Sequence, residues 1–205
     1  MPELSNIQTY EKINNSNFEP TLNRFANVLK NIGLWNTEIK TDFDSVKWEV
    51  EDNRFIYSSV AELGYFTSNL SSIKIRPLFT IYTPAIDDTF NENWIGCEFL
   101  IEANEIRSYK NGKLHAYAYD LVRALVFEMH KEFKQTGVYF TDEAQDGGDF
   151  DGVRCNVPEK LWQFDYALIP SSLEKLYSKK PYRHSIKHHE SYFEAWYIER
   201  WKEKQ

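Results

Sequence analysis

The chain has 205 residues and a net charge of −7, with 42% hydrophobic and 27% charged residues. This composition predicts a folded globular protein of one domain and excludes the polar, aromatic-poor chains that stay disordered. The acidic balance argues against nucleic-acid binding, because neutralising phosphates needs a basic surface.

The N-terminal sequence and the cysteines predict a cytoplasmic protein. Residues 1–17 lack the basic start, apolar stretch and cleavage site of a secretory signal, and no apolar run has membrane-spanning length. Cys97 and Cys155 are too few for a disulfide framework and form no Cys-x-x-Cys pair. Cys97 stands in an apolar stretch, which predicts a small buried thiol rather than a nucleophile.

The first elements along the chain are an arm and a helix. Residues 1–18 are polar and Asn-rich without a clear period, so we expect a loose N-terminal arm followed by a single domain over 19–205. From Pro20 to Gly33, apolar residues recur at helical spacing, at Leu22, Phe25, Ala26, Leu29 and Ile32. This pattern predicts an amphipathic helix that ends at Gly33.

Strand patterns follow over residues 45–103. Alternation around Trp48 and a second run over 54–58 predict a hairpin with one dry face. The run 72–83 alternates but contains Pro77, which predicts an edge strand or a bulge because proline cannot donate to a ladder. Residues 94–103 predict another strand, and Asn111-Gly112 a turn.

Helical periodicity returns in the second half. From Ala116 a stripe of Leu121, Leu125, Met129 and Phe133 predicts a central helix ending at Gly137. Residues 138–141 predict a strand, and the capping box at Ser171 predicts a short helix. Aromatic residues at helical spacing over 185–204 predict a C-terminal aromatic helix. The expected class is α+β, a largely antiparallel sheet flanked by the central and C-terminal helices.

The segment TDEAQDGGDFDG, residues 141–152, is the first candidate site. It does not fit a helix-loop-helix calcium loop, because Gly152 at position six puts Gly147 at position one and Pro158 at position twelve. A looser site for Mg²⁺ or Ca²⁺ would use Asp142, Asp146, Asp149 and Asp151. The alternative is a solvated loop with turns at the glycines.

A histidine pair is the second candidate. His184 and His188 would share one face of a helix and could join the acidic segment in a site for metal-assisted hydrolysis. The pattern is not that of a metalloprotease, which places Glu directly after the first His. The sequence contains neither a G-x-S-x-G motif nor a Gly-rich phosphate loop, so we predict no catalytic residue and no cofactor, with a divalent metal as the alternative.

Charge and aromatic residues favour binding to a protein. Residues 1–173 carry a net charge of −10 and residues 174–205 a net charge of +3. Lys179, Lys180, Arg183 and Lys187 precede the C-terminal rings and form a basic-aromatic patch, although a docked helix with snorkelling lysines gives the same pattern. The expected partner-binding residues are Asp142, Glu143, Asp146, Asp149, Asp151, Tyr192, Trp196 and Trp201.

Three classes of function therefore remain open. The best supported is a non-enzymatic acidic protein that recognises or neutralises a protein partner with a basic surface, as inhibitor or immunity proteins do. The alternatives are a metal-dependent hydrolase using residues 142–151 with His184 and His188, and a structural subunit of a larger assembly. No membrane or nucleic-acid partner is expected, and the sequence does not indicate the oligomeric state.

Overall fold

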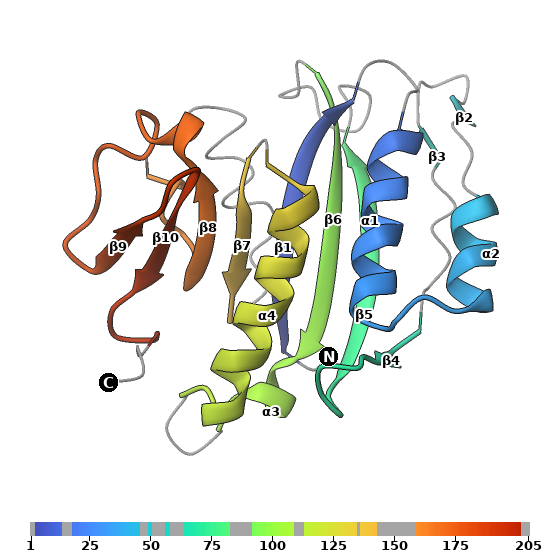
Figure 1. Cartoon of the computed structure of the whole chain (residues 1–205), viewed down its shortest axis with the longest axis horizontal. Coiled ribbons are helices and arrows are strands. Elements are labelled where there is room, and N and C mark those ends of the chain that lie inside the picture. Colours follow the sequence, from blue (N-terminus) through green and yellow to red (C-terminus); the bar gives the residue numbers. More distant parts are fainter. Residues whose placement is uncertain are drawn as a thin grey trace.

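The computed structural model describes residues 3–13, 18–45, 49–50, 56–57, 64–82, 92–108, 113–134, 136–142 and 159–201. Eight strands form one sheet in the order β4-β5-β6-β1-β7-β8-β10-β9, and each neighbouring pair is antiparallel (Figure 1). The strands are β1 (Leu4–Ile13), β4 (Phe66–Thr67), β5 (Lys74–Tyr82), β6 (Asn93–Glu102), β7 (Val138–Thr141), β8 (Tyr166–Pro170), β9 (His184–His188) and β10 (Tyr192–Tyr197). The predicted α+β class with a largely antiparallel sheet is therefore confirmed.

Helices lie against one face of this sheet (Figure 1). They are α1 (Glu19–Asn31), α2 (Thr37–Ser45), α3 (Ala103–Ile106) and α4 (Ala116–Glu132), with a 3₁₀ turn η1 (Ser171–Leu173) after β8. Phe25 of α1 packs on Phe99 of β6 with ring centroids 5.5 Å apart. The apolar stripes of α1 and α4 thus form the main core with the sheet face that they cover.

The predicted helix over 20–33 and the predicted helix from Ala116 both occur. α1 ends two residues before Gly33, which has a φ of 74° and so takes the left-handed conformation that glycine favours. α4 ends at Glu132, before the predicted end at Gly137. Gly137 instead precedes β7 with a φ of 90°, and a Cβ there would lie 2.8 Å from the Leu168 carbonyl oxygen.

The predicted strands are also present where they can be compared. β2 (Glu49–Val50) pairs with β3 (Ile56–Tyr57) as the expected hairpin, while the side chains of its dry face lie outside the described residues. Pro77 pairs with Phe99 of β6, and the described β4 reaches only Lys74 and Ile75 on the other side of β5. Pro77 therefore stands beyond the described β4 ladder, as its missing N–H requires. The turn at Asn111-Gly112 lies outside the described residues.

The expectation of a loose arm over residues 1–18 is wrong for the described residues 4–13. Leu4–Ile13 form β1, which lies inside the sheet between β6 and β7. The strand is buried although half of it is polar, because its side chains have partners. Asn6 Nδ2 donates to Gln8 Oε1 at 3.1 Å and to Glu98 Oε2 at 2.9 Å, and Thr9 Oγ1 donates to the Gly137 carbonyl at 2.7 Å. These hydrogen bonds replace the apolar alternation that would have marked a strand.

The expected C-terminal aromatic helix is also wrong, because residues 184–188 and 192–197 are strands β9 and β10. Phe193 and Ala195 point into a second core on the sheet face away from the helices, while Trp196 points into the main core. Rings at positions 192, 193, 196 and 197 fit helical spacing, but they fit equally well a strand that is buried on both faces. Pairing with β8 supplies the backbone hydrogen bonds, and aromatic residues favour strands.

Candidate functional site

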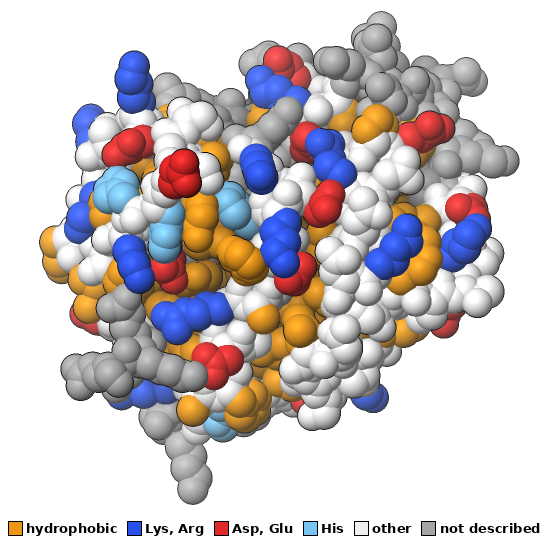
Figure 2. Space-filling view, in the orientation of Figure 1, with side chains coloured by type: hydrophobic (Ala, Val, Ile, Leu, Met, Phe, Trp, Pro, Cys, Tyr) orange, Lys and Arg blue, Asp and Glu red, His pale blue; other side chains and the backbone are white. Residues whose placement is uncertain are grey.

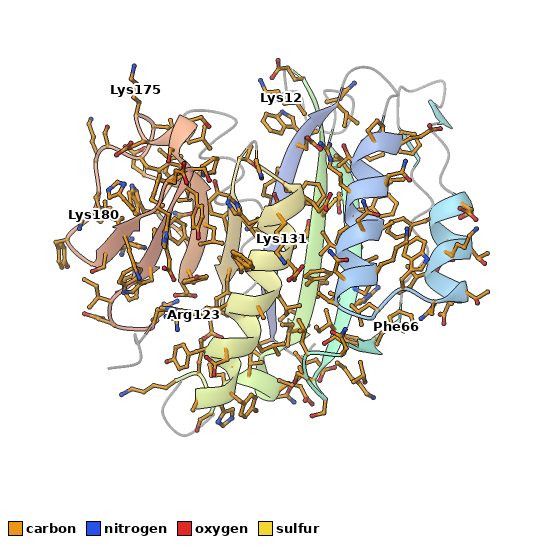
Figure 3. All side chains as sticks on the ribbon, in the orientation of Figure 1. Lys12, Phe66, Arg123, Lys131, Lys175 and Lys180 are labelled. Atoms are coloured by element: carbon orange, nitrogen blue, oxygen red, sulfur yellow. The ribbon has the colours of Figure 1, made fainter. Side chains whose placement is uncertain are left out.

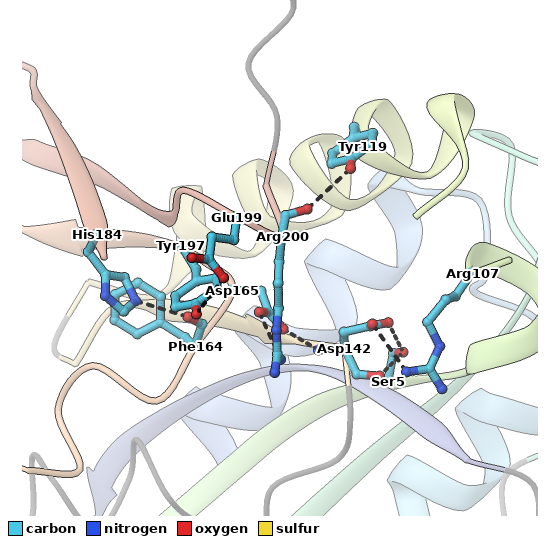
Figure 4. Close-up of polar contacts among 10 residues, drawn as sticks. All are labelled: Ser5, Arg107, Tyr119, Asp142, Phe164, Asp165, His184, Tyr197, Glu199 and Arg200. Carbon is cyan, nitrogen blue, oxygen red and sulfur yellow. Dashed lines mark hydrogen bonds and ion pairs between the residues drawn. The ribbon is translucent and has the colours of Figure 1, made fainter. Parts of the chain in front are cut away.

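Asp142 is the one residue of the predicted acidic segment, apart from Thr141, whose surroundings are described. It follows β7, is buried, and is held from three sides (Figure 4). Its backbone N–H donates to Asp165 Oδ2 at 2.7 Å, Ser5 Oγ donates to its carbonyl at 2.7 Å, and Arg107 Nη1 lies 3.4 Å from its Oδ2. The start of the acidic segment is therefore fixed to β1, to the residue after α3, and to the residue before β8.

Burial raises the pKa of the Asp142 carboxyl, and the nearby carboxylate of Asp165 raises it further. Arg107, the Ser5 hydroxyl and Arg200 act in the opposite direction. Burial is the larger effect, since removing a carboxylate from water disfavours its charged form. In the described structure, the contacts of Asp142 with Ser5, Arg107 and Asp165 hold three parts of the fold together.

The remaining predicted metal and partner ligands of this segment, Glu143, Asp146, Asp149 and Asp151, lie outside the described residues. Within the part of the chain that is described, no three His, Cys, Asp or Glu side chains are grouped as a metal site. Metal binding by the segment stays a prediction.

Asp165 connects this point to the C-terminal strands. Its backbone N–H donates to the Phe140 carbonyl at 2.8 Å, and its carbonyl accepts from the Tyr197 N–H at 2.9 Å. Its side chain lies 3.2 Å from Arg200 Nη1. The pair Phe164–Asp165 therefore lies between Asp142 on one side and the ends of β9 and β10 on the other (Figure 4).

His184 lies at the far side of this connection, inside an aromatic cage. Its Nε2 is 3.2 Å from the Phe164 carbonyl, and its ring centroid is 5.1 Å from Trp162, 5.2 Å from Phe164 and 5.4 Å from Tyr197. Burial lowers the pKa of His184 to about 4, and the positive charges of Arg183 and Lys180 contribute to this shift. The imidazole is therefore neutral at physiological pH.

The helical basis for pairing His184 with His188 is wrong. Both residues lie on β9, where positions four apart are separated by roughly 13 Å rather than by one helical turn. The ring of His188 is exposed, with Nδ1 3.8 Å from Glu174 Oε1. A metal site that combines Asp142 with His184 stays a prediction; the structure links the two residues only through Asp165 and Phe164.

Two of the three aromatic residues expected to bind a partner are buried. Trp201 is 1% exposed and stacks on Tyr166 at 4.3 Å, while Trp196 is 9% exposed. The guanidinium of Arg123, which α4 carries (Arg123 is labelled in Figure 3), lies 5.5 Å from the centroid of the Trp201 ring. Tyr192 is partly buried between His130 and His189. The expectation that Trp196 and Trp201 are surface anchors is wrong, because both rings are part of the main core.

A pocket of about 250 Å³ is the feature that sequence reasoning missed. It lies where residues 162–165 meet the ends of β9 and β10, and it is lined by Trp162, Gln163, Phe164, Asp165, Arg183, Tyr197 and Arg200. The basic-aromatic composition of residues 179–201 was a signal for it, and Arg183 belongs to the predicted patch. Its location depended on the strand pairing of β9 and β10, which the helical prediction concealed.

Cys97 is buried in β6, as predicted. Burial raises its thiol pKa well above the ordinary value, and the carboxylates of Glu11 and Glu98 act in the same direction. The thiol is therefore protonated, in keeping with a packing role. Cys155 lies outside the described residues.

Surface charge on the helix-bearing face is mixed. Lys and Arg side chains lie among Asp and Glu, and most of the visible histidines lie over the β8–β10 end (Figure 2). Among the described helices, none has both the length and the apolar character needed to cross a membrane. No protein-family model, curated protein or solved structure matches the chain.

Proposed function

We propose that the protein is a non-enzymatic binding protein that recognises or neutralises a protein partner with a basic surface. The acidic segment that begins at Asp142 is the docking element, as in inhibitor or immunity proteins. Four further carboxylates follow Asp142 within nine residues, in a chain with a net charge of −7. Such a charge excess steers a basic partner and accelerates association.

The single observation that carries this proposal is the attachment of Asp142. The Ser5 hydroxyl, the Arg107 guanidinium and the Asp165 carboxylate fix its carbonyl, side chain and backbone N–H. A segment that starts from a fixed point loses less conformational freedom when it binds, so more of the interaction energy remains as affinity. Trp196 and Trp201 are not part of this docking element, because both are buried.

The test compares two triple variants with the wild-type protein. In the docking variant, Asp146, Asp149 and Asp151 are changed to Asn. In the control, the exposed residues Glu38, Glu105 and Glu190 are changed to Gln, which removes the same charge elsewhere. Partners captured from cells by the immobilised proteins are identified, and their association rates are then measured over a salt series.

We expect the docking variant to associate about tenfold more slowly at low salt and with a flatter salt dependence, since fewer charges attract the partner. The control should keep nearly the wild-type rate. Equal association rates for all three proteins, or no partner captured by the wild-type protein, would contradict the proposal.

The metal-dependent hydrolase and the structural subunit stay as alternatives without a specific observation in their favour. Thermal unfolding of the EDTA-treated protein with Mg²⁺, Ca²⁺, Mn²⁺ or Zn²⁺ distinguishes the first, because an ion that binds only the folded state raises the melting temperature. A saturable rise that Asp149→Ala abolishes would favour the hydrolase over the binding protein.

A further inference from the structure

The pocket beside β9 and β10 combines aromatic walls with positive charge. Trp162, Phe164 and Tyr197 supply the rings, and Gln163 supplies an amide. The guanidinium groups of Arg183 and Arg200 lie over the same ring, 5.6 Å and 5.4 Å from the centroid of Tyr197 (Figure 4 shows Tyr197 and Arg200). A cation–π contact of this kind orients the planar guanidinium over the ring. Its N–H groups point outward in the guanidinium plane and remain free to donate hydrogen bonds to a ligand.

The two arginines differ in their partners. Arg200 is paired with the buried Asp165 carboxylate, 3.2 Å from its Nη1. Arg183 has no ion pair or side-chain hydrogen bond to any residue in the described ranges, and its contact is the Tyr197 ring. The charges of Arg200 and Asp165 cancel, so the pocket retains one positive charge, that of Arg183.

The neighbouring histidine experiences this charge. His184 lies directly behind the aromatic wall, and Arg183 and Lys180 contribute to the fall of its pKa to about 4, after burial. Lys180 Nζ donates to the His184 carbonyl at 2.6 Å, so a second cation lies close by. The imidazole therefore stays neutral and adds no charge beside the pocket.

We propose that this pocket binds a carboxylate carried on a small apolar or aromatic group. Arg183 donates two parallel hydrogen bonds to the carboxylate, the Gln163 amide donates a third, and the rings of Trp162 and Tyr197 contact the apolar part. A planar guanidinium matches a carboxylate in both geometry and charge. The second negative charge of a phosphate dianion would face the Asp165 carboxylate, so the pocket favours a monoanion.

The size of the pocket limits the ligand. A volume of about 250 Å³ lies below the range of sites for drug-sized molecules. It suits either a free aryl or alkyl carboxylic acid or the last residue of a peptide with a free C-terminus. Both sources present the same chemistry, a carboxylate next to an apolar group.

Calorimetric titration with two pairs of probes tests the proposal and separates the sources. One pair is phenylacetate and its neutral analogue phenylacetamide. The other is acetyl-Ala-Phe with a free carboxylate and the same peptide as an amide. We expect saturable binding of at least one free carboxylate, and binding of its amide weaker by about tenfold or more, because a charge-assisted pair is lost. Binding of phenylacetate indicates a free acid, and binding of the peptide alone indicates a C-terminus.

Matched variants locate the binding. Arg183→Gln should weaken binding of the free carboxylate by about tenfold or more. Arg183→Lys should weaken it by less, since lysine keeps the positive charge but cannot donate two parallel hydrogen bonds. Lys187→Gln removes an equal charge from the same strand outside the pocket and should leave affinity within about twofold. Thermal unfolding verifies that each variant is folded.

No saturable binding of either carboxylate up to about 10 mM would overturn the proposal, since this limit already corresponds to very weak affinity. Equal binding by the wild-type protein and Arg183→Gln would also overturn it. This test changes Arg183 and Lys187, whereas the docking test changes Asp146, Asp149 and Asp151, so either proposal can fail without the other.

Discussion

The strands β1 and β10 are both buried inside the same sheet, yet different interactions hold them. β1 places Ser5, Asn6, Gln8, Thr9 and Glu11 in the interior, where each makes a hydrogen bond or an ion pair, although Asn6 Oδ1 accepts none from the described residues. β10 places Phe193, Ala195 and Trp196 in the interior, and aromatic packing surrounds them. The cost of burying a polar strand is offset by partners, whereas the aromatic strand gains from leaving water.

This difference shows that polar side chains are buried in this protein where partners are available to them. Arg24 of α1 pairs with Glu11, and Thr21 Oγ1 donates to the same carboxylate at 2.9 Å. A buried charge is tolerated there because a helix residue neutralises it. The two strands should therefore respond differently to substitution and to acid.

The largest expected effect is at the aromatic end, for Trp201→Ala. Trp201 is 1% exposed and packs against Tyr166, Tyr119 and Phe140. Its truncation leaves a large cavity, so we expect a loss of about 3–5 kcal/mol in the free energy of unfolding, measured by urea denaturation with circular dichroism.

The control for this substitution is Tyr182→Ala, because Tyr182 is 93% exposed and should cost less than about 0.5 kcal/mol. If Trp201→Ala also cost less than about 1 kcal/mol, its ring would not be part of a packed core. The earlier expectation that Trp201 anchors a partner would then return.

The same contrast explains what the sequence could predict. The helix α1 and the strands β5, β6 and β7 follow hydrophobic periodicity, and the sequence predicted them. β1 has no such periodicity because most of its buried side chains are polar. Their partners, among them Glu98, Asp142 and Gly137, are far away in the chain. Long-range pairing of polar groups leaves no hydrophobic pattern in the local sequence, so residues 4–13 were predicted to be a loose arm.

The prediction for the C-terminal strands failed for the opposite reason. The spacing of their aromatic residues gave a strong signal, but that signal was ambiguous between helix and strand. Rings at positions 192, 193, 196 and 197 fit a helix as well as a doubly buried strand. The location of the pocket was likewise hidden by the wrong secondary structure. Arg183 was recognised as part of a basic patch, but its pocket needs residues 162–165 and Arg200, which only the strand pairing brings together.

Acid should destabilise the aromatic end through His184. Burial lowers the pKa of its imidazole from 6.5 to about 4. The unfolded chain therefore takes up a proton near pH 6.5 that the folded protein accepts only near pH 4. Stability contributed by the neutral ring is complete above pH 6.5 and is lost as the pH falls to 4, by up to about 3 kcal/mol.

Urea denaturation over this pH range tests that loss. His184→Phe should flatten the decline in the free energy of unfolding, and His188→Gln, an exposed ring on the same strand, serves as the control. Part of the decline should remain in His184→Phe, because burial also lowers the pKa of His130 to about 4. An identical pH profile for wild type and His184→Phe would show that His184 does not titrate as a buried group.

The smaller expected effect is on β1, for Asn6→Ala. The Asn6 amide donates to both Gln8 and Glu98, and its removal takes one donor from each of two buried acceptors. We expect a loss of about 2 kcal/mol in the free energy of unfolding at neutral pH, by urea denaturation. This is below the effect at Trp201, because less volume is removed.

Asn6→Leu separates hydrogen bonding from packing, since leucine keeps the branched four-atom skeleton of the asparagine side chain and has no donor. If β1 is held by its polar partners, Leu should be no more stable than Ala, because either substitution withdraws the same two hydrogen bonds from Gln8 and Glu98. Recovery of wild-type stability by Leu would mean that volume alone holds the strand, as it does for Trp196 in β10. The contrast between the two strands would then be one of composition and not of the forces that bury them.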